Sequence, residues 1–196
     1  MRRFVWIMVV LYLLVLCGPV TSYGQENDIG LNPLQWEVGT EYITPTHENR
    51  QIDTASLNIL AGRESSVYPN WSFYKGITIT DGWGDVIRSH GSYVTYHSSA
   101  RGIGPVFLAR YQALQTDKLL FSFDMSGSLI FYNREFPAGG DRYNFMWRNG
   151  PNLKFKIDDD LSWGIGYQWM HVSNGQRSRN PSYEGRGVTL SVSKSF

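Results

Sequence analysis

The chain has 196 residues, a length that suits a single domain or one barrel. Its 18 Lys and Arg residues balance 17 Asp and Glu residues, so no basic field exists and nucleic acid is excluded as an expected partner. Aromatic residues make up 15% of the chain, and its 7 Trp and 12 Tyr residues indicate anchoring at a membrane interface.

The N-terminus has the features of a secretory signal peptide. After two arginines, an apolar run extends from Phe4 to Cys17, and Ser22-Tyr23-Gly24 forms a small-x-small cleavage site. The run is too short for a comfortable transmembrane helix, although an uncleaved anchor is the alternative. We therefore expect a signal peptide over 1–24 and a mature domain over 25–196. This domain would have no cysteine, and so neither a disulfide nor a thiolate mechanism.

Beyond this leader, apolar and polar residues alternate with the period of two that is typical of strands. The alternation is clearest over 118–131, where Leu119 and Phe121 share one face and Ser122 and Asp124 share the other. In chain order, the predicted strands cover 34–44, 53–62, 71–80, 102–112, 118–131, 143–157, 161–173 and 184–196.

The boundaries between strands rest on local turn signals. Asp81-Gly82-Trp83-Gly84-Asp85 is typical of a turn, and Ser92 to Tyr96 is either a separate strand or an extension of the next one. Gly150-Pro151 predicts a bulge or kink within the sixth strand. Asp158-Asp159-Asp160 predicts a tight turn before the seventh.

One face of these strands is apolar and the other carries Asp, Lys, Glu and Ser, which is typical of a small transmembrane barrel with a polar interior. The segments lack a 3.6-residue period, so helices are excluded. The final strand ends at Phe196, and a terminal aromatic resembles the ending of bacterial outer-membrane barrels. We expect an all-β fold, an eight-stranded antiparallel transmembrane β-barrel. A soluble secreted barrel of the lipocalin type, with its apolar faces inward, is the alternative.

Three reactive side chains fall on one predicted patch. His171 and Ser173 continue the apolar row of the seventh strand, and Glu184 belongs to the apolar row of the eighth. Both ends of an even-stranded bacterial barrel lie in the periplasm, which puts this patch at the outer end. Alternate residues are separated by about 6.6–6.8 Å at Cα, and opposed cross-strand Cβ atoms by about 4.5–5.5 Å. The pattern predicts a nucleophile (Ser173), a base (His171) and an orienting acid (Glu184).

Neighbouring residues suggest how a substrate would be held. Asn174 and nearby backbone N–H groups, including that of Gly175, are candidates for an oxyanion hole. Arg186 is either an ion-pair partner of Glu184 or a phosphate contact. No metal site or cofactor is expected. The remaining histidines lie in predicted loops without ligand spacing: His47, His90 and His97.

A histidine at a barrel rim and a glutamate at the start of a strand also occur without catalysis. The main alternative is therefore a non-catalytic outer-membrane barrel with a structural or adhesive role. A second alternative is an outer-membrane phospholipase or acyltransferase, which would use the same surface residues on a different ester.

The end of the chain resembles the lipid A 3-O-deacylase (PagL-type) family. The resemblance rests on His171-Val172-Ser173-Asn174-Gly175, a short loop, Asn180-Pro181-Ser182-Tyr183-Glu184 and a final alternating strand. It covers Tyr167 to Phe196 and departs from the family at Ser182, where a glycine is expected. The family is an eight-stranded outer-membrane barrel with a His-Ser-Glu triad on its outer face.

The resemblance implies Ser173 as nucleophile, His171 as base, Glu184 as acid and Asn174 as oxyanion support. The implied reaction is hydrolysis of the 3-O-linked 3-hydroxyacyl ester of lipid A at the outer leaflet, by a serine esterase without cofactor. The expected partners are lipopolysaccharide or lipid A as substrate and outer-membrane lipid, and a homodimer is left open. The expected location is the bacterial outer membrane.

Overall fold

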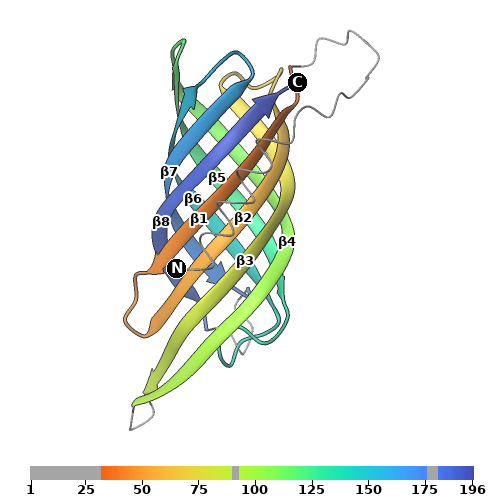
Figure 1. Ribbon diagram of the computed structural model, residues 1–196. Coiled ribbons are helices and arrows are strands. Elements are labelled where there is room, and N and C mark those ends of the chain that lie inside the picture. Colours follow the sequence, from red (N-terminus) through yellow and green to blue (C-terminus); the bar gives the residue numbers. More distant parts are fainter. Residues whose placement is uncertain (1–31, 90–92, 176–180) are drawn as a thin grey trace.

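A computed structural model describes residues 32–89, 93–175 and 181–196. Within these residues the chain forms a closed barrel of eight antiparallel strands, each paired with its neighbours in sequence (Figure 1). The predicted eight-stranded antiparallel barrel is confirmed. The predicted signal peptide, 1–24, lies outside the described residues.

The strands are β1 (Gln35–Pro45), β2 (Arg50–Glu64), β3 (Trp71–Ser89), β4 (Tyr93–Gln115), β5 (Leu119–Tyr132), β6 (Tyr143–Lys156), β7 (Leu161–Ser173) and β8 (Tyr183–Ser195). Pairing of β1 with β8 closes the barrel and leaves neither strand with an open edge. None of the described residues forms a helix long and apolar enough to cross a membrane.

The two ends of the barrel are distinguished by which strands begin and which strands finish there. At one end, which we call the site end, β1, β3, β5 and β7 finish and β2, β4, β6 and β8 begin. The connections β2–β3, β4–β5 and β6–β7 and Phe196 lie at the opposite end (Figure 1). At the site end β3 and β4 continue past β2 and β5 as a projecting hairpin (Figure 1).

The turn predicted at Asp81-Gly82-Trp83-Gly84-Asp85 is wrong, because these residues continue β3 and pair with β4. Glycine occurs at these positions because neighbouring groups approach the backbone closely, and not because the chain turns. A Cβ at Gly82 would meet the ring of Phe136, and one at Gly84 would meet the backbone carbonyl of Gln51. From Tyr93 onward the next segment extends β4, one of the two outcomes left open for it.

The bulge predicted at Gly150-Pro151 is also wrong. Asn149 lies opposite Trp169 and Asn152 lies opposite Gly166, so the register between β6 and β7 is the same on both sides. The register shift instead lies in β4, between Gln112 and Leu114, where it meets β5.

Apolar side chains cover the outside of the barrel. The exposed large residues of the strands include Ile77, Phe107, Phe121, Trp147 and Ile165. A soluble barrel of the lipocalin type would need these faces inward, so that alternative is contradicted. The outward apolar surface is what a barrel in lipid requires.

The interior of the opposite half holds a buried charge network. Arg110 donates to Asp124 at 2.8 Å and to Glu37 at 2.9 Å, and Lys154 Nζ donates to Glu37 at 2.6 Å. The Arg110 guanidinium also lies 5.1 Å from the ring centroid of Tyr74. Opposite charges and hydrogen bonds therefore satisfy groups that would be costly to bury alone.

An apolar cluster fills much of the interior at the site end. Phe136, from the β5–β6 loop, is fully buried there, with its ring 4.9 Å from that of Tyr132 and 5.9 Å from that of Tyr183. The remaining members of this cluster are Ile43, Ile52, Val86, Ala100, Ile130, Met146, Met170 and Val172. The cluster lies behind the first residues of β8 and supports them from within the barrel.

Candidate functional site

His171 lies on the outer surface at the site end, between two neighbouring strands. It is opposite Trp147 of β6 on one side and opposite Glu184 of β8 on the other. Ser173, two residues further along β7, is opposite Phe145. Because alternate residues of a strand share a face, His171 and Ser173 project on the same side of the sheet.

The structure joins two of the predicted site residues directly. His171 Nδ1 is 3.0 Å from Glu184 Oε1, and the two side chains are 45% and 47% exposed. With Nδ1 bound to the carboxylate, Nε2 is the nitrogen that remains for a hydroxyl, as in a serine esterase. Among the described residues, no hydrogen bond joins Ser173 to His171. Such bonds often shorten only when substrate is bound.

His47 is a neighbour of Glu184 that the sequence did not reveal. Its Nε2 is 3.0 Å from Glu184 Oε2, the carboxylate oxygen that His171 does not use. The backbone N–H of Thr46 also donates to the carbonyl of Glu184, at 3.1 Å. Strand alternation cannot place a turn residue. The one available signal was barrel closure, which puts the end of β1 beside the start of β8.

Two imidazoles and a carboxylate could suggest a metal site, but their geometry differs from that of metal ligands. His47 and His171 bind different oxygens of Glu184. No group of three His, Cys, Asp or Glu side chains in the described part of the chain is arranged to hold a metal ion. His47, Glu184 and His171, which we call the trio, form a hydrogen-bonded chain centred on the Glu184 carboxylate.

Asn174 and Gly175 lie at the end of β7. The Asn174 side chain is 2% exposed, and its Nδ2 donates to Asp141 of the β5–β6 loop at 2.9 Å. This amide therefore ties two loops together on the inner side, away from the face that carries Ser173. Gly175 has a φ of 79°, a left-handed conformation that favours glycine. It lies beside Phe145, where an added Cβ would be 3.6 Å from the ring.

Arg186 is exposed and lies outside the trio. It is opposite Trp169 of β7 and Thr44 of β1. The Glu184 oxygens bind the two histidines, and no ion pair joins Arg186 to Glu184 within the described residues. Of its two predicted roles, the phosphate contact is the one that this position leaves open.

Large aromatic side chains surround the trio on the side of β6 and further along β7. Trp147 is 61% exposed and lies opposite Gly127 of β5, where an added Cβ would be 3.7 Å from the ring. The rings of Tyr167 and Trp169 meet edge to face at 5.3 Å. These rings form an apolar surface directly beside His171.

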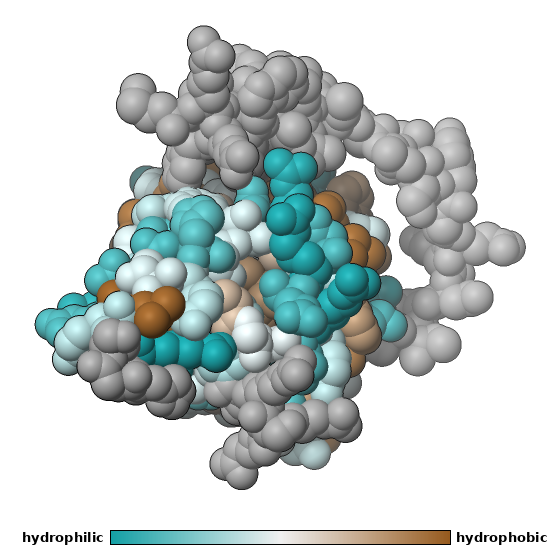
Figure 2. Space-filling model, turned by 90° about the horizontal axis from the view of Figure 1, so that it is seen from below, coloured by the Kyte–Doolittle hydropathy of each residue, from teal (hydrophilic) through white to brown (hydrophobic). Residues whose placement is uncertain are grey.

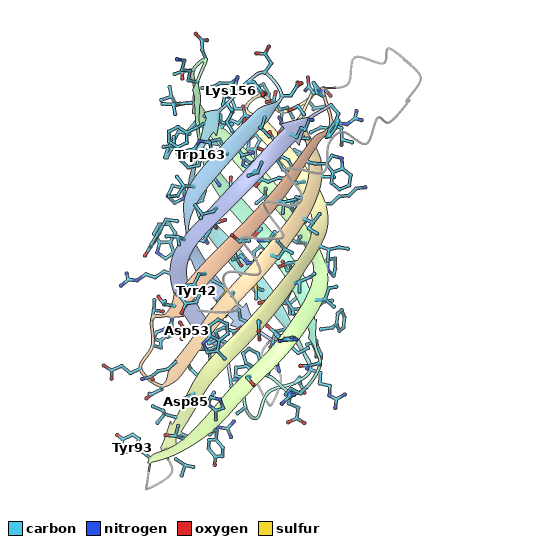
Figure 3. The ribbon with its side chains drawn as sticks, viewed as in Figure 1. Tyr42, Asp53, Asp85, Tyr93, Lys156 and Trp163 are labelled. Carbon is cyan, nitrogen blue, oxygen red and sulfur yellow. The ribbon has the colours of Figure 1, made fainter. Side chains whose placement is uncertain are left out.

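Polar pairs also lie on the outer face of the strands toward the site end. The Tyr42 hydroxyl donates to Asp53 at 3.0 Å across β1 and β2 (Figure 3). Asp85 binds His97 at 3.0 Å on the projecting hairpin. From the site end, the described rim is largely hydrophilic, and hydrophobic surface appears mainly at its outer edge (Figure 2). The trio thus lies beside exposed aromatic rings, at the end of the barrel whose described rim is largely hydrophilic.

Comparisons with known proteins give likeness of fold. No family model matches the chain. No curated protein matches it either. Among solved structures, the outer membrane enzyme PagL is similar with a TM-score of 0.53 and 14% identity, over 79% of this chain and 97% of that one. The outer membrane protein AlkL, solved by solid-state NMR in DMPC bilayers, has a TM-score of 0.36 and 10% identity, over 91% and 95%.

At such identities the likeness to PagL, an outer-membrane enzyme, establishes the barrel fold alone. This architecture and the apolar exterior fit an outer-membrane location.

Proposed function

We propose that the chain is an outer-membrane lipid A 3-O-deacylase that uses Ser173, His171 and Glu184. The observation that carries the proposal is the 3.0 Å contact between His171 Nδ1 and Glu184 Oε1 on the outward face, with Ser173 next on the same row. A carboxylate on Nδ1 orients the imidazole and stabilises the imidazolium that forms when Nε2 accepts a proton.

The proposed reaction has two steps. His171 Nε2 takes the proton of the Ser173 hydroxyl as Oγ attacks the ester carbonyl carbon, and the imidazolium then returns that proton to the departing sugar oxygen. Water, activated by His171, next attacks the acyl-serine and releases a 3-hydroxy fatty acid and free Ser173. Glu184 stays ionised throughout. In this mechanism the backbone near Gly175 is the candidate oxyanion donor, since the Asn174 side chain binds Asp141.

The surroundings suit a lipid ester. Trp147 and Phe145 offer apolar surface to an acyl chain on the β6 side, and both are exposed. Arg186 lies on the other side of His171 and is the candidate contact for a phosphate of the substrate. In the proposed orientation the site end faces the bacterial exterior, where the outer leaflet carries lipid A.

Mass spectrometry of lipid A from a bacterial host tests the proposal. Expression of the chain should remove one 3-hydroxyacyl group from lipid A, and Ser173→Ala should abolish this loss. Ser162→Ala, at the other end of β7, is the control and should retain activity. The shift in gel mobility on heating checks that each variant folds as a barrel.

Three outcomes would reject the proposal. Unchanged lipid A despite a folded barrel in the outer membrane would favour a structural or adhesive barrel. Release of fatty acids from phospholipids instead would favour a phospholipase. Full activity of Ser173→Ala would remove the triad mechanism.

A further inference from the structure

The Glu184 carboxylate is held by two imidazoles from opposite sides of β8. His171 of β7 binds Oε1 and His47 of the β1–β2 turn binds Oε2, each at 3.0 Å. We propose that His47 is a positioning residue of the esterase site, which fixes Glu184 for its contact with His171. The inference rests on the proposed function and extends the triad to a fourth side chain.

The backbone around His47 is anchored to the same strand that carries Glu184. The N–H of Thr46 donates to the Glu184 carbonyl at 3.1 Å, and the N–H of Arg50 donates to the His47 carbonyl at 3.2 Å. Pro45 is the last residue of β1 and lies opposite Gly185. These backbone contacts therefore hold the His47 imidazole in a defined position beside the Glu184 carboxylate.

Exposure makes a second hydrogen bond useful at this position. The Glu184 side chain is 47% exposed, so packing alone does not fix the rotation of its carboxylate. A donor on Oε2 restricts that rotation and leaves Oε1 directed at His171 Nδ1. The same N–H stabilises the negative charge that must persist while His171 becomes imidazolium.

The contact is too exposed to be important for stability. The His47 side chain is 59% exposed, and solvent-exposed pairs of this kind contribute little to folding. Variants at His47 should therefore fold normally, and an effect on catalysis should be separable from an effect on the barrel.

The test compares purified His47→Ala, His47→Gln and His97→Ala, with lipopolysaccharide in detergent micelles as substrate. His47→Ala should lower kcat about three- to tenfold with KM unchanged, the range expected for one lost hydrogen bond to an orienting group. The Gln amide can still donate to Oε2, so His47→Gln should recover most of the loss. His97 has a matching 3.0 Å contact with Asp85 on the projecting hairpin, away from Glu184. Its variant should keep full activity.

A double-variant cycle tests whether His47 acts through Glu184. In a Glu184→Ala background, adding His47→Ala should cause no further loss. An equal loss in both backgrounds, wild-type kcat in His47→Ala, or no recovery in His47→Gln would overturn the inference. These results differ from a failure of the proposed function, in which the wild-type chain and Ser173→Ala would be equally active or equally inactive on lipid A.

Discussion

Trp147 lies directly opposite His171 in the register of β6 and β7, and on its other side it lies opposite Gly127 of β5, which has no side chain to cover the ring. The ring therefore forms a flat apolar surface that begins beside the proposed base. An acyl chain whose ester reaches His171 and Ser173 would run along this surface before it enters the surrounding lipid.

We expect Trp147→Ala to reduce kcat/KM for lipopolysaccharide about tenfold, since losing contact with roughly two methylene groups costs about 0.8 kcal/mol each. Steady-state kinetics in detergent micelles measures the effect. Trp163→Ala is the control, because Trp163 is also a lipid-facing tryptophan but lies at the opposite end (Figure 3). Equal losses in the two variants would mean that Trp147 has no particular role at the site.

The charge network in the barrel interior is expected to govern stability and to leave catalysis unchanged. Arg110→Ala would leave Glu37 and Asp124 buried without their main partner, which typically costs about 3–5 kcal/mol. Urea unfolding in lipid vesicles, followed by tryptophan fluorescence, measures this change in the free energy of unfolding. Arg63→Ala, at an exposed position of β2, should change it by less than about 0.5 kcal/mol. Similar midpoints for both variants would contradict the prediction.

The alternation of apolar and polar residues predicted most of the fold, because each strand has one row of lipid-facing residues. The predicted seventh strand, 161–173, coincides with β7, since its alternation is uninterrupted and an aspartate turn precedes it. The same parity argument places His171 and Glu184 on one face of adjacent strands, and the structure adds the hydrogen bond between them. Alternation alone predicts that two residues share a face and lie at the same height along the barrel. It does not predict the distance between their side chains.

Contacts made by turns and by the barrel interior were not predictable in this way. Gly82 and Gly84 are typical of a turn locally, yet close packing against Phe136 and β2 requires glycine within a strand. His47 lies in a turn and meets Glu184 only through closure of β1 on β8. Asn174 is directed inward by its contact with Asp141, which no local pattern of β7 indicates.

Two glycines, Gly150 of β6 and Gly127 of β5, are expected to differ in their response to alanine. A Cβ on Gly150 would meet the backbone carbonyl of Tyr167 on the neighbouring strand, so Gly150→Ala should destabilise β6–β7 pairing by about 1–3 kcal/mol. A Cβ on Gly127 would lie 3.7 Å from the Trp147 ring, an ordinary contact, so Gly127→Ala should fold normally. The fraction refolded into vesicles, read from gel mobility, distinguishes them. Equal refolding yields would show that β7 can move to accommodate the methyl group.

Phe136 is expected to link the apolar cluster inside the site end to the proposed catalytic surface. It is fully buried and contacts the ring of Tyr183, the residue directly before Glu184. Phe136→Ala should lower the free energy of unfolding by about 3–5 kcal/mol through the cavity it leaves. It should also reduce deacylation below the unfolding transition, because Tyr183 loses the ring that fixes its position. Phe136→Leu fills most of that volume and should recover more than half of both losses. Wild-type activity in a clearly destabilised Phe136→Ala barrel would show that the interior cluster supports the fold without positioning Glu184.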